Sequence, residues 1–375
     1  MKFVFVGEKK LKKASVLGIG RLGLCFALTL ERGGYDVVGS DIREDHVKSV
    51  NDRTFDTCEP DVCKFLSEAK NFRATSSLKE AVEHSDMLFV TVRTGSDSSG
   101  VYNCTQVDKL VSDLQQIGKV DNKDLVVCCN VKPGYSDTVE QRLSPYGYKV
   151  SFNPEWVAQG TILRDQAYPD LVVIGQYDTE SGDRIQKVYE DICLSDPVIH
   201  RMDRKSAEIT KISLNCFLTA KLSFANMVGQ IAIASGCEPA KILSAIGTDS
   251  RINPKYFKYG FGYGGPCFPR DNRAMVTYAE EIGIPPFISK AVIETNDRHL
   301  DFMVNHFVET HSKDENVVIE SVTYKPGTVI LEESQQLLYA ERLAKAGFSV
   351  TIKEHPDVIE AVKETYGDLF TYEQR

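Results

Sequence analysis

The sequence predicts an α/β fold, and the order of two kinds of pattern along the chain supports this. Short runs of apolar and β-branched residues alternate with helical patterns up to about residue 200, and the alternation returns after about residue 312. Such alternation is typical of parallel sheets with crossover helices. A long helical pattern separates the two regions. We therefore expect an N-terminal α/β domain at residues 1–200, a central helical region at 201–300 and a short C-terminal α/β domain at 301–375.

The first element is a short buried strand at residues 14–17, followed by Gly18-Ile19-Gly20-Arg21-Leu22-Gly23 and an apolar helix at 24–30. A second strand at 35–40 ends at Asp41. Gly-x-Gly-x-x-Gly between strand and helix, with an acid about 20 residues on, is the dinucleotide fingerprint of a Rossmann-type domain. Its glycines bring a diphosphate close to a helix N-terminus. The residues expected to contact the cofactor here are Gly18, Gly20, Arg21, Leu22 and Gly23.

Asp41 sets the expected cofactor. Its carboxylate would accept hydrogen bonds from the adenine ribose hydroxyls and would repel a 2′-phosphate. Arg43, two residues later, opposes this preference slightly. The sequence therefore predicts NAD rather than NADP.

Later strands follow the same apolar pattern. They are expected at residues 87–92, 125–129, 171–175, 317–322 and 348–352, with a helix at 335–346 between the last two. Glu155 follows a proline at the end of a strand near residue 152, which is where α/β proteins build their sites. It is interpreted either as a site residue or as a solvated loop acid.

A helix at residues 206–235, ended by Gly236, is apolar around most of its surface. Its apolar residues include Ile209, Ile212, Phe217, Leu218, Leu222, Phe224, Val228 and Ile231. Such a helix is buried between domains or at a subunit interface. Lys211 and Asn215 share one face of it, and Glu208 lies one turn before Lys211. Lys211 is interpreted either as an exposed, snorkelling side chain or, with Asn215, as a donor to an oxygen that gains negative charge.

The segment from Gly260 to Asp271 is rich in glycine and ends in Cys267-Phe268-Pro269-Arg270-Asp271. Glycine lets main chain approach a ligand closely, and Pro269 suits a first helical turn. A thiol at a helix N-terminus has a lowered pKa and becomes a usable nucleophile. The alternative is a surface loop in which the cysteine is incidental.

The composition limits the function classes. The chain has 375 residues, of which 42% are hydrophobic, and a net charge of −9. An acidic protein is a poor match for nucleic acid or an anionic membrane. No apolar run long enough to span a bilayer and no secretory signal are expected. The ten cysteines show no Cys-x-x-Cys pair and no zinc spacing, so free thiols, no metal and a cytoplasmic location are expected.

Taken together, these motifs resemble the nucleotide-sugar dehydrogenase family of UDP-glucose and GDP-mannose 6-dehydrogenases. The matching segments are the fingerprint at Gly18, Asn153-Pro154-Glu155, residues 207–215, residues 249–252, the loop from Gly260 to Asp271 and residues 324–328. The Cys-Phe-Pro-Arg-Asp ending looks more like the UDP-glucose branch.

The resemblance implies a four-electron oxidation of the sugar C6 alcohol to a carboxylate, with two NAD molecules used in turn. Cys267 would form a thiohemiacetal and then a thioester. Lys211 and Asn215 would stabilise oxyanions, while Asp271 and Glu155 would handle protons and the hydrolytic water. Arg251 would reach the sugar across the interface of a homodimer, and the glycine-rich loop with Lys325 would hold the nucleotide diphosphate. The further residues expected at the site are Thr94, Asn130 and Arg270 for the cofactor, and Tyr256, Lys258, Gly264 and Phe268 for the substrate.

The sequence also departs from the family pattern. Asn130 replaces a threonine that helps position the catalytic water, and Gln159 stands where a second glutamate is usual. Glu332 occupies the position of an arginine that contacts NAD. Residues 301–375 form a shortened last domain, and Met1 to Lys13 are additional. A non-catalytic relative that binds NAD or a nucleotide sugar, and a two-electron hydroxyacid dehydrogenase, therefore remain alternatives. The second would need no thiol.

Overall fold

The computed structural model describes residues 11–96 and 100–375. The chain divides into two compact units, which are treated separately below. The first contains residues up to 95 together with 102–211, and the second contains the segment near 96–101 together with 212–375. The division into three domains stays a prediction.

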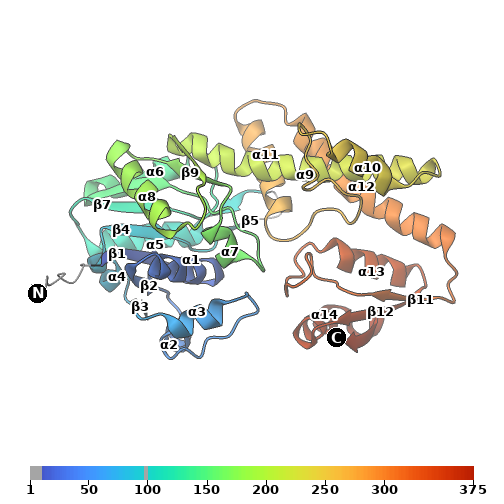
Figure 1. Cartoon of the computed structure of the whole chain (residues 1–375), viewed down its shortest axis with the longest axis horizontal. Coiled ribbons are helices and arrows are strands. Elements are labelled where there is room, and N and C mark those ends of the chain that lie inside the picture. Colours follow the sequence, from blue (N-terminus) through green and yellow to red (C-terminus); the bar gives the residue numbers. More distant parts are fainter. Residues whose placement is uncertain (1–10, 97–99) are drawn as a thin grey trace, which may run out of the picture. The chain divides into compact units, whose positions relative to one another are not determined.

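The first unit is built on an eight-stranded sheet with the strand order β10-β9-β8-β7-β4-β1-β2-β3 (Figure 1). The strands are β1 (Lys12–Leu17), β2 (Tyr35–Ser40), β3 (Phe72–Thr75), β4 (Met87–Val90), β7 (Lys123–Val127), β8 (Tyr148–Phe152), β9 (Leu171–Gly175) and β10 (Val198–Met202). A separate two-stranded sheet joins β5 (Gly95–Ser96) to β6 (Tyr102–Asn103). The order of the central strands confirms the Rossmann-type fold that the fingerprint predicts.

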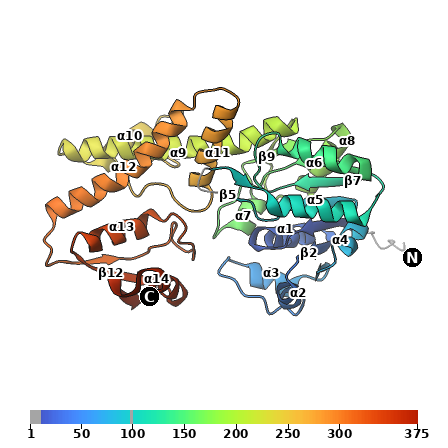
Figure 2. The same cartoon turned by 180° about the vertical axis from the view of Figure 1, so that it is seen from behind.

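Helices cover both faces of this sheet, as the two opposite views show (Figures 1 and 2). One core joins the sheet to α1 (Arg21–Arg32), α2 (Glu44–Asn51), α3 (Val62–Glu68), α7 (Ile162–Ala167) and α8 (Thr179–Ile192). The other core joins it to α4 (Leu78–His84), α5 (Thr105–Ile117) and α6 (Tyr135–Leu143), with the short helix η1 (Ser144–Tyr146) after α6. Since helices cover both faces, the central strands are mostly apolar and buried, as in β4 (Met87–Val90), where all four residues are buried.

Two strands, β9 and β10, run against the direction of the other strands of the sheet. The strand predicted at 171–175 is present as β9, but it meets β8 in an antiparallel arrangement at Phe152 and Gly175. Parallel pairing needs a connection that returns the chain to the opposite edge of the sheet. The helix between these strands, α7, has only six residues. Because the two strands are antiparallel, the connection between β8 and β9 leaves and re-enters the sheet at the same edge. Glu155 lies in this connection.

The second unit contains helices and a small parallel sheet. Its sheet has the order β11-β12-β13, formed by β11 (Asn316–Ile319), β12 (Ser349–Glu354) and β13 (Thr371–Gln374). Its helices are α10 (Pro239–Gly247), α11 (Phe268–Glu281), α12 (Phe287–Thr310), α13 (Gln335–Lys345), α14 (Pro356–Tyr366) and η2 (Gly367–Leu369). Residues of α12, α13, α14 and the three strands share one core. This confirms the C-terminal α/β region.

Element bounds differ from expectation at several ends. The strands predicted to reach residues 92, 129 and 322 end at Val90, Val127 and Ile319. Cys128 and Cys129 therefore lie just after β7, although both are buried. Lys12 and Lys13 begin β1 rather than belonging to an additional segment, and residues 1–10 lie outside the described residues.

The long central helix, α9 (Arg204–Ala234), is 31 residues long and continues from the first unit into the second. By length and composition it could cross a membrane, which corrects the expectation that no segment reaches that length and hydropathy. Core helices of globular proteins pass the same test. Here Ala207, Ile212 and Ala225 are buried against neighbouring elements, while Phe217, Phe224 and Ile231 are exposed at spacings of seven residues.

Candidate active site

The turn between β1 and α1 has the shape that a dinucleotide diphosphate requires. A Cβ atom on Gly23 would lie 2.1 Å from the Gly18 carbonyl oxygen and 2.4 Å from the Thr91 hydroxyl, so only glycine lets α1 pack this closely. A Cβ on Gly20, by contrast, would meet no atom within 4 Å. The open side of the turn therefore lies at the N-terminus of α1, where phosphates bind. These residues fit NAD.

Asp41 lies at the end of β2, where the ribose is expected, and it is paired within its own loop. Arg43 Nε and a terminal guanidinium nitrogen donate to the two carboxylate oxygens at 2.9 and 3.1 Å. Burial disfavours the charged carboxylate, but these hydrogen bonds outweigh it and the pKa of Asp41 is lowered. Arg43 is therefore held directly beside the acid that is expected to bind the cofactor ribose.

Other expected cofactor residues follow strands of the same sheet. Thr94 and Asn130 come after β4 and β7, at the edge formed by the carboxyl ends of the parallel strands. Arg21 is exposed and donates to the Gln159 side chain at 2.6 Å. This bond joins the fingerprint turn to the loop after β8, through the amide that stands where the family has a glutamate.

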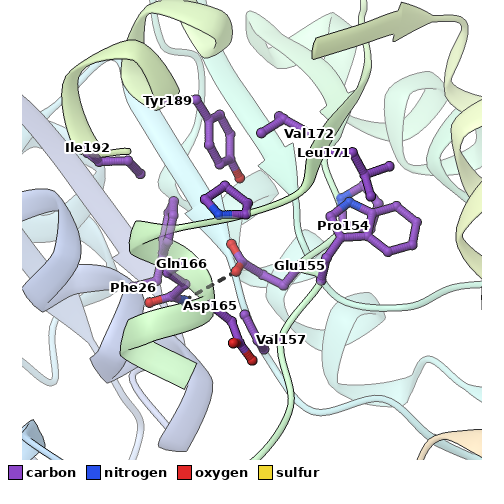
Figure 3. A pocket seen from close by; sticks show the side chains of 12 residues that line it. Phe26, Pro154, Glu155, Val157, Asp165, Gln166, Leu171, Val172, Tyr189 and Ile192 are labelled. Carbon is purple, nitrogen blue, oxygen red and sulfur yellow. Dashed lines mark hydrogen bonds between the residues drawn. The ribbon is translucent and has the colours of Figure 1, made fainter. Parts of the chain in front are cut away.

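Glu155 lies in a pocket inside the first unit (Figure 3). Gln166 Nε2 donates to Glu155 Oε2 at 3.2 Å. Its other oxygen, Oε1, is buried and has no hydrogen-bond partner among the described residues. Burial raises the pKa of Glu155 to about 7, against the opposing effects of the Gln166 hydrogen bond and the Lys211 charge. Glu155 is therefore not a solvated loop acid.

Lys211 belongs to the same neighbourhood. Its Nζ donates to the backbone oxygen of Glu155 at 2.8 Å and lies 4.4 Å from the centre of the Trp156 ring. The residue is only 8% exposed, which excludes the exposed or snorkelling interpretation. One turn earlier on α9, the buried Glu208 accepts hydrogen bonds from the backbone amides of Gly134 and Ser136, at the start of α6. This contact fixes the loop that carries Asn130.

In the second unit, Cys267 is the N-cap residue of α11 and is exposed. The position at a helix N-terminus is the one predicted; whether its pKa is lowered stays a prediction. One turn into α11, Asp271 is fully buried. It accepts hydrogen bonds from Asn215 Nδ2 at 2.6 Å and from Arg270 Nε at 2.9 Å.

A second pair of side chains ties the same turn to α9. Asn272 Nδ2 donates to Thr219 Oγ1 at 2.8 Å, and the Cys216 thiol lies 3.5 Å from the Asp271 carbonyl oxygen. The start of α11 is thus fastened to α9 at several consecutive residues. Cys267 is therefore exposed at the N-terminus of a helix whose first turn is hydrogen-bonded to α9.

The glycine-rich loop packs against the segment that contains Lys325. Gly265 has φ +78°, and a Cβ there would lie 2.4 Å from the Tyr324 ring. A Cβ on Gly264 would lie 2.2 Å from the Glu333 carbonyl oxygen. Arg273 of α11 pairs with the Glu333 carboxylate, with its nearer nitrogen at 2.6 Å. The structure therefore brings the segment that contains Lys325 against the cysteine loop.

Three other predicted residues and Glu332 are exposed at the surface of the second unit. The side chain of Arg251 is 86% exposed and pairs with Asp249, two residues earlier. Lys258 is exposed as well. Tyr256, with φ +59°, packs edge-on against Phe268 at 6.1 Å. Glu332 is exposed, and its carbonyl oxygen accepts a hydrogen bond from the Gly265 amide.

Sequence analysis missed several residues that support the site. Three of them, Gln166, Asn272 and Arg273, lie within helices, and Glu59 lies in the loop before α3, with no local pattern to mark them. Glu59, for example, is buried and accepts hydrogen bonds from the amides of Gly160 and Ile162, which fixes the end of the Glu155 loop. Glu208 did give a signal, since an acid on a mostly apolar helix needs a buried partner.

The comparisons with known proteins agree with this geometry. Residues 12–193 match the NAD-binding domain of the UDP-glucose/GDP-mannose dehydrogenase family, and residues 205–298 match the central domain of the same family. The UDP-glucose 6-dehydrogenase AglM of Haloferax volcanii is 27% identical over 95% of this chain and 86% of that protein. A GDP-mannose 6-dehydrogenase of Pseudomonas savastanoi is 28% identical over 91% of this chain and 80% of its own length.

A solved UDP-glucose dehydrogenase from Pyrobaculum islandicum has the same fold, with a TM-score of 0.87 and 28% identity, over 100% of this chain and 88% of the other. The match therefore extends over both units and is not limited to a shared Rossmann-type domain. NAD is the cofactor and a nucleotide sugar is the substrate. The chain belongs to the UDP-glucose/GDP-mannose dehydrogenase family, whose members are NAD-dependent enzymes that oxidise a nucleotide sugar at C6.

Proposed function

We propose that this enzyme oxidises UDP-glucose to UDP-glucuronate in two steps through a covalent intermediate on Cys267. The observation that supports this most is the position of Cys267, exposed at the N-terminus of a helix whose first turn is fixed by Asp271, Asn215 and Asn272. A nucleophile held in this way keeps its alignment with a bound substrate. Oxidation of an alcohol to a ketone alone would not need it.

The chemistry assigns a role to each neighbouring group. After the C6 alcohol has lost a proton and a hydride to become an aldehyde, the Cys267 thiolate adds to it, and the resulting oxyanion takes up a proton to give a thiohemiacetal. Loss of the hydroxyl proton and a second hydride converts this to a thioester, and water releases the carboxylic acid and the thiol. NAD, when bound, accepts each hydride. Lys211 and Asn215 would stabilise the negative oxygen at C6, and Glu155 would accept protons.

The cofactor would be held by the turn from Gly18 to Gly23 and by Asp41, with Thr94, Asn130 and Arg270 completing its site. For the substrate, Lys325 and the glycine-rich loop from Gly260 to Gly265 would hold the diphosphate. Phe268, Tyr256 and Lys258 would surround the remainder of the nucleotide sugar. The choice of UDP-glucose rests on the Cys-Phe-Pro-Arg-Asp sequence, because relatives named for UDP-glucose and for GDP-mannose are similarly identical to this chain.

We also propose that the enzyme is a homodimer, located in the cytoplasm, in which Arg251 reaches the partner's sugar site. The exposed apolar side chains on α9 support a dimer: Phe217 is 67% exposed and Ile231 is 59% exposed. Large exposed apolar stripes of this kind mark protein interfaces. Arg251 uses Nε and one terminal nitrogen for Asp249 in its own loop, and its other terminal nitrogen, which has no partner among the described residues, would suit a polar group on the partner's substrate.

The test is the stoichiometry of NADH with a panel of UDP- and GDP-sugars. Two NADH per UDP-glucose, with UDP-glucuronate as the product, would support the proposal. One NADH per sugar would mean that oxidation stops at the aldehyde, and faster turnover of a GDP-sugar or an amino sugar would reassign the substrate. Sedimentation of the active enzyme as a monomer would overturn the dimer.

A further inference from the structure

Glu155 depends on a single amide for the hydrogen bonding of its side chain. The carboxylate lies in the pocket formed by α1, α7, α8 and the loop after β8, and the bond from Gln166 is drawn in Figure 3. Oε1 is buried without a partner among the described residues. A buried carboxylate is stable as an anion only when donors satisfy it. Burial favours the neutral form of Glu155, and the Gln166 hydrogen bond is the first of the contacts that favour its anion.

Gln166 is itself held from the other side. It is 4% exposed, and its Oε1 accepts a hydrogen bond from Thr29 Oγ1 at 3.0 Å. Thr29 lies on α1, the helix that follows the fingerprint turn, and its hydroxyl is also 2.9 Å from the Cys25 carbonyl oxygen. The Gln166 amide is oriented with its oxygen toward this hydroxyl and its NH₂ group toward Glu155. The single Thr29 proton is shared between the Gln166 and Cys25 oxygens. The chain Thr29–Gln166–Glu155 thus connects the cofactor helix to the proposed base.

The other ionisable groups around the pocket do not replace this donor. Lys211 bonds to the backbone oxygen of Glu155, and its charge favours the anion from that side. The Asp165 carboxylate is occupied by the Ala158 amide at 2.9 Å and the Thr161 hydroxyl at 2.7 Å. The remaining groups are weak acids whose pKa values are raised mainly by burial and further by nearby charges, the Glu155 carboxylate among them: Cys25, Cys128, Tyr189 and Cys193.

We propose that Gln166 is a positioning residue that keeps Glu155 in its ionised, proton-accepting form at neutral pH. The proposal rests on the function assigned to Glu155 above and deepens it. Removing the amide takes away the described donor to the carboxylate, so the protonated form gains. Since the pKa of Glu155 lies at about 7, even a modest change moves the group across the working pH.

The first experiment compares the pH dependence of kcat in the unmodified enzyme and in Gln166→Leu. Loss of one hydrogen bond to a charged group should move the acid limb upward by about one pH unit. The matched control is Gln186→Leu, which removes an exposed amide that donates to the Glu190 carboxylate at 3.0 Å. The control should leave the profile in place. An unchanged limb in Gln166→Leu would overturn the proposal.

A second experiment does not depend on turnover, so failure of the proposed function would leave it intact. The pH dependence of urea unfolding is measured for the unmodified chain, Gln166→Leu, Glu155→Gln and the double variant. Gln166→Leu should shift the steep part of the curve toward higher pH, and this shift should vanish when Glu155 is already glutamine. A shift of equal size in the Glu155→Gln background would show that Gln166 acts on another group and would refute the assignment.

Discussion

The first turn of α11 and the pocket around Glu155 each bury a carboxyl group, but they satisfy it very differently. Asp271 is fully buried, and it accepts hydrogen bonds from both Arg270 and Asn215. Glu155 has one oxygen 3.2 Å from the Gln166 amide and one buried oxygen without a partner among the described residues. Burying a charge costs a large free energy unless it is paired and hydrogen-bonded.

This difference in hydrogen bonding suits the two buried acids to different roles. Asp271, with a guanidinium and an amide as donors, fixes the start of α11 under Cys267. Glu155, whose pKa is raised to about 7 by burial, can gain or lose a proton near neutral pH. We infer that a complete donor set produces a rigid support, while an incomplete set produces a group suited to proton transfer. The predictions below test this contrast.

The largest effect is expected at Cys267, the N-cap residue of α11. Cys267→Ser keeps the size of the side chain, but a serine hydroxyl is almost never ionised at neutral pH. Turnover should fall by several orders of magnitude, which corresponds to about 4 kcal/mol or more in the barrier. Steady-state NADH production measures this. The exposed Cys237 is the matched control, and Cys237→Ser should leave turnover unchanged.

Chemical modification gives a second check on the same residue. Iodoacetamide should modify Cys267 before the other exposed thiols, Cys58, Cys63 and Cys237, and bound nucleotide sugar should protect it. Near-normal production of two NADH per sugar by Cys267→Ser would leave the family assignment standing but remove the covalent mechanism.

The next largest effect is expected at Asp271, whose hydrogen bonds fix the first turn of α11. Asp271→Ala would leave Arg270 without its carboxylate and Asn215 without its acceptor. Breaking a buried ion pair from one side costs about 3–5 kcal/mol, so urea unfolding should show a loss of that order. The control is Glu294→Ala, which removes an exposed pair with Arg298 and should cost less than about 1 kcal/mol. Equal losses in the two variants would contradict the role given to Asp271.

A smaller effect follows from protonation of two acids whose pKa values are raised by burial. Burial raises the pKa of Glu155 and of Glu208 to about 7, against about 4.3 in an unfolded chain. Between about pH 5 and pH 7 the folded protein therefore binds more protons, and its free energy of unfolding falls as the pH rises. Each group should contribute about 1–3 kcal/mol to this fall.

The measurement is urea unfolding at several pH values from 5 to 8. Glu155→Gln and Glu208→Gln should each reduce the slope, while Glu83→Gln, on an exposed part of α4, should not. A slope that is the same in all four proteins would mean that these two carboxyl groups ionise as they do in water.

Much of this site could be predicted because its signals are local. The spacing of Gly18, Gly20 and Gly23 is set by one turn, and Cys267 precedes a proline at the start of a helix. Lys211 and Asn215 are four residues apart on one helix face. In each case a few consecutive residues contain the constraint, so the sequence pattern alone was sufficient.

The supporting contacts could not be predicted, because their partners are distant in sequence. Glu208 binds amides more than 70 residues away, and Arg273 binds a carboxylate 60 residues away. Gln166 is only 11 residues from Glu155, but they meet because the chain between them turns back and α7 packs on α1, which no local pattern specifies. Such contacts depend on how elements pack, which residue types alone do not specify.

The smallest effect is expected at Asp41. This third acid differs from Asp271 and Glu155 because its carboxylate pairs with an arginine of its own loop. It is largely buried, yet its partner Arg43 is 54% exposed and only two residues away. In Asp41→Ser the carboxylate that repels a 2′-phosphate is gone, and the Arg43 guanidinium is released to bind one. The ratio of kcat/KM for NAD to that for NADP should therefore fall by about tenfold, or about 1.4 kcal/mol. In Asp41→Ser/Arg43→Ala the gain with NADP should be lost again, because no cation remains in the loop segment from Asp41 to Arg43. If NADP is used equally well by the single and the double variant, Arg43 plays no part in the choice of cofactor, and the pairing with Asp41 serves only to order the loop.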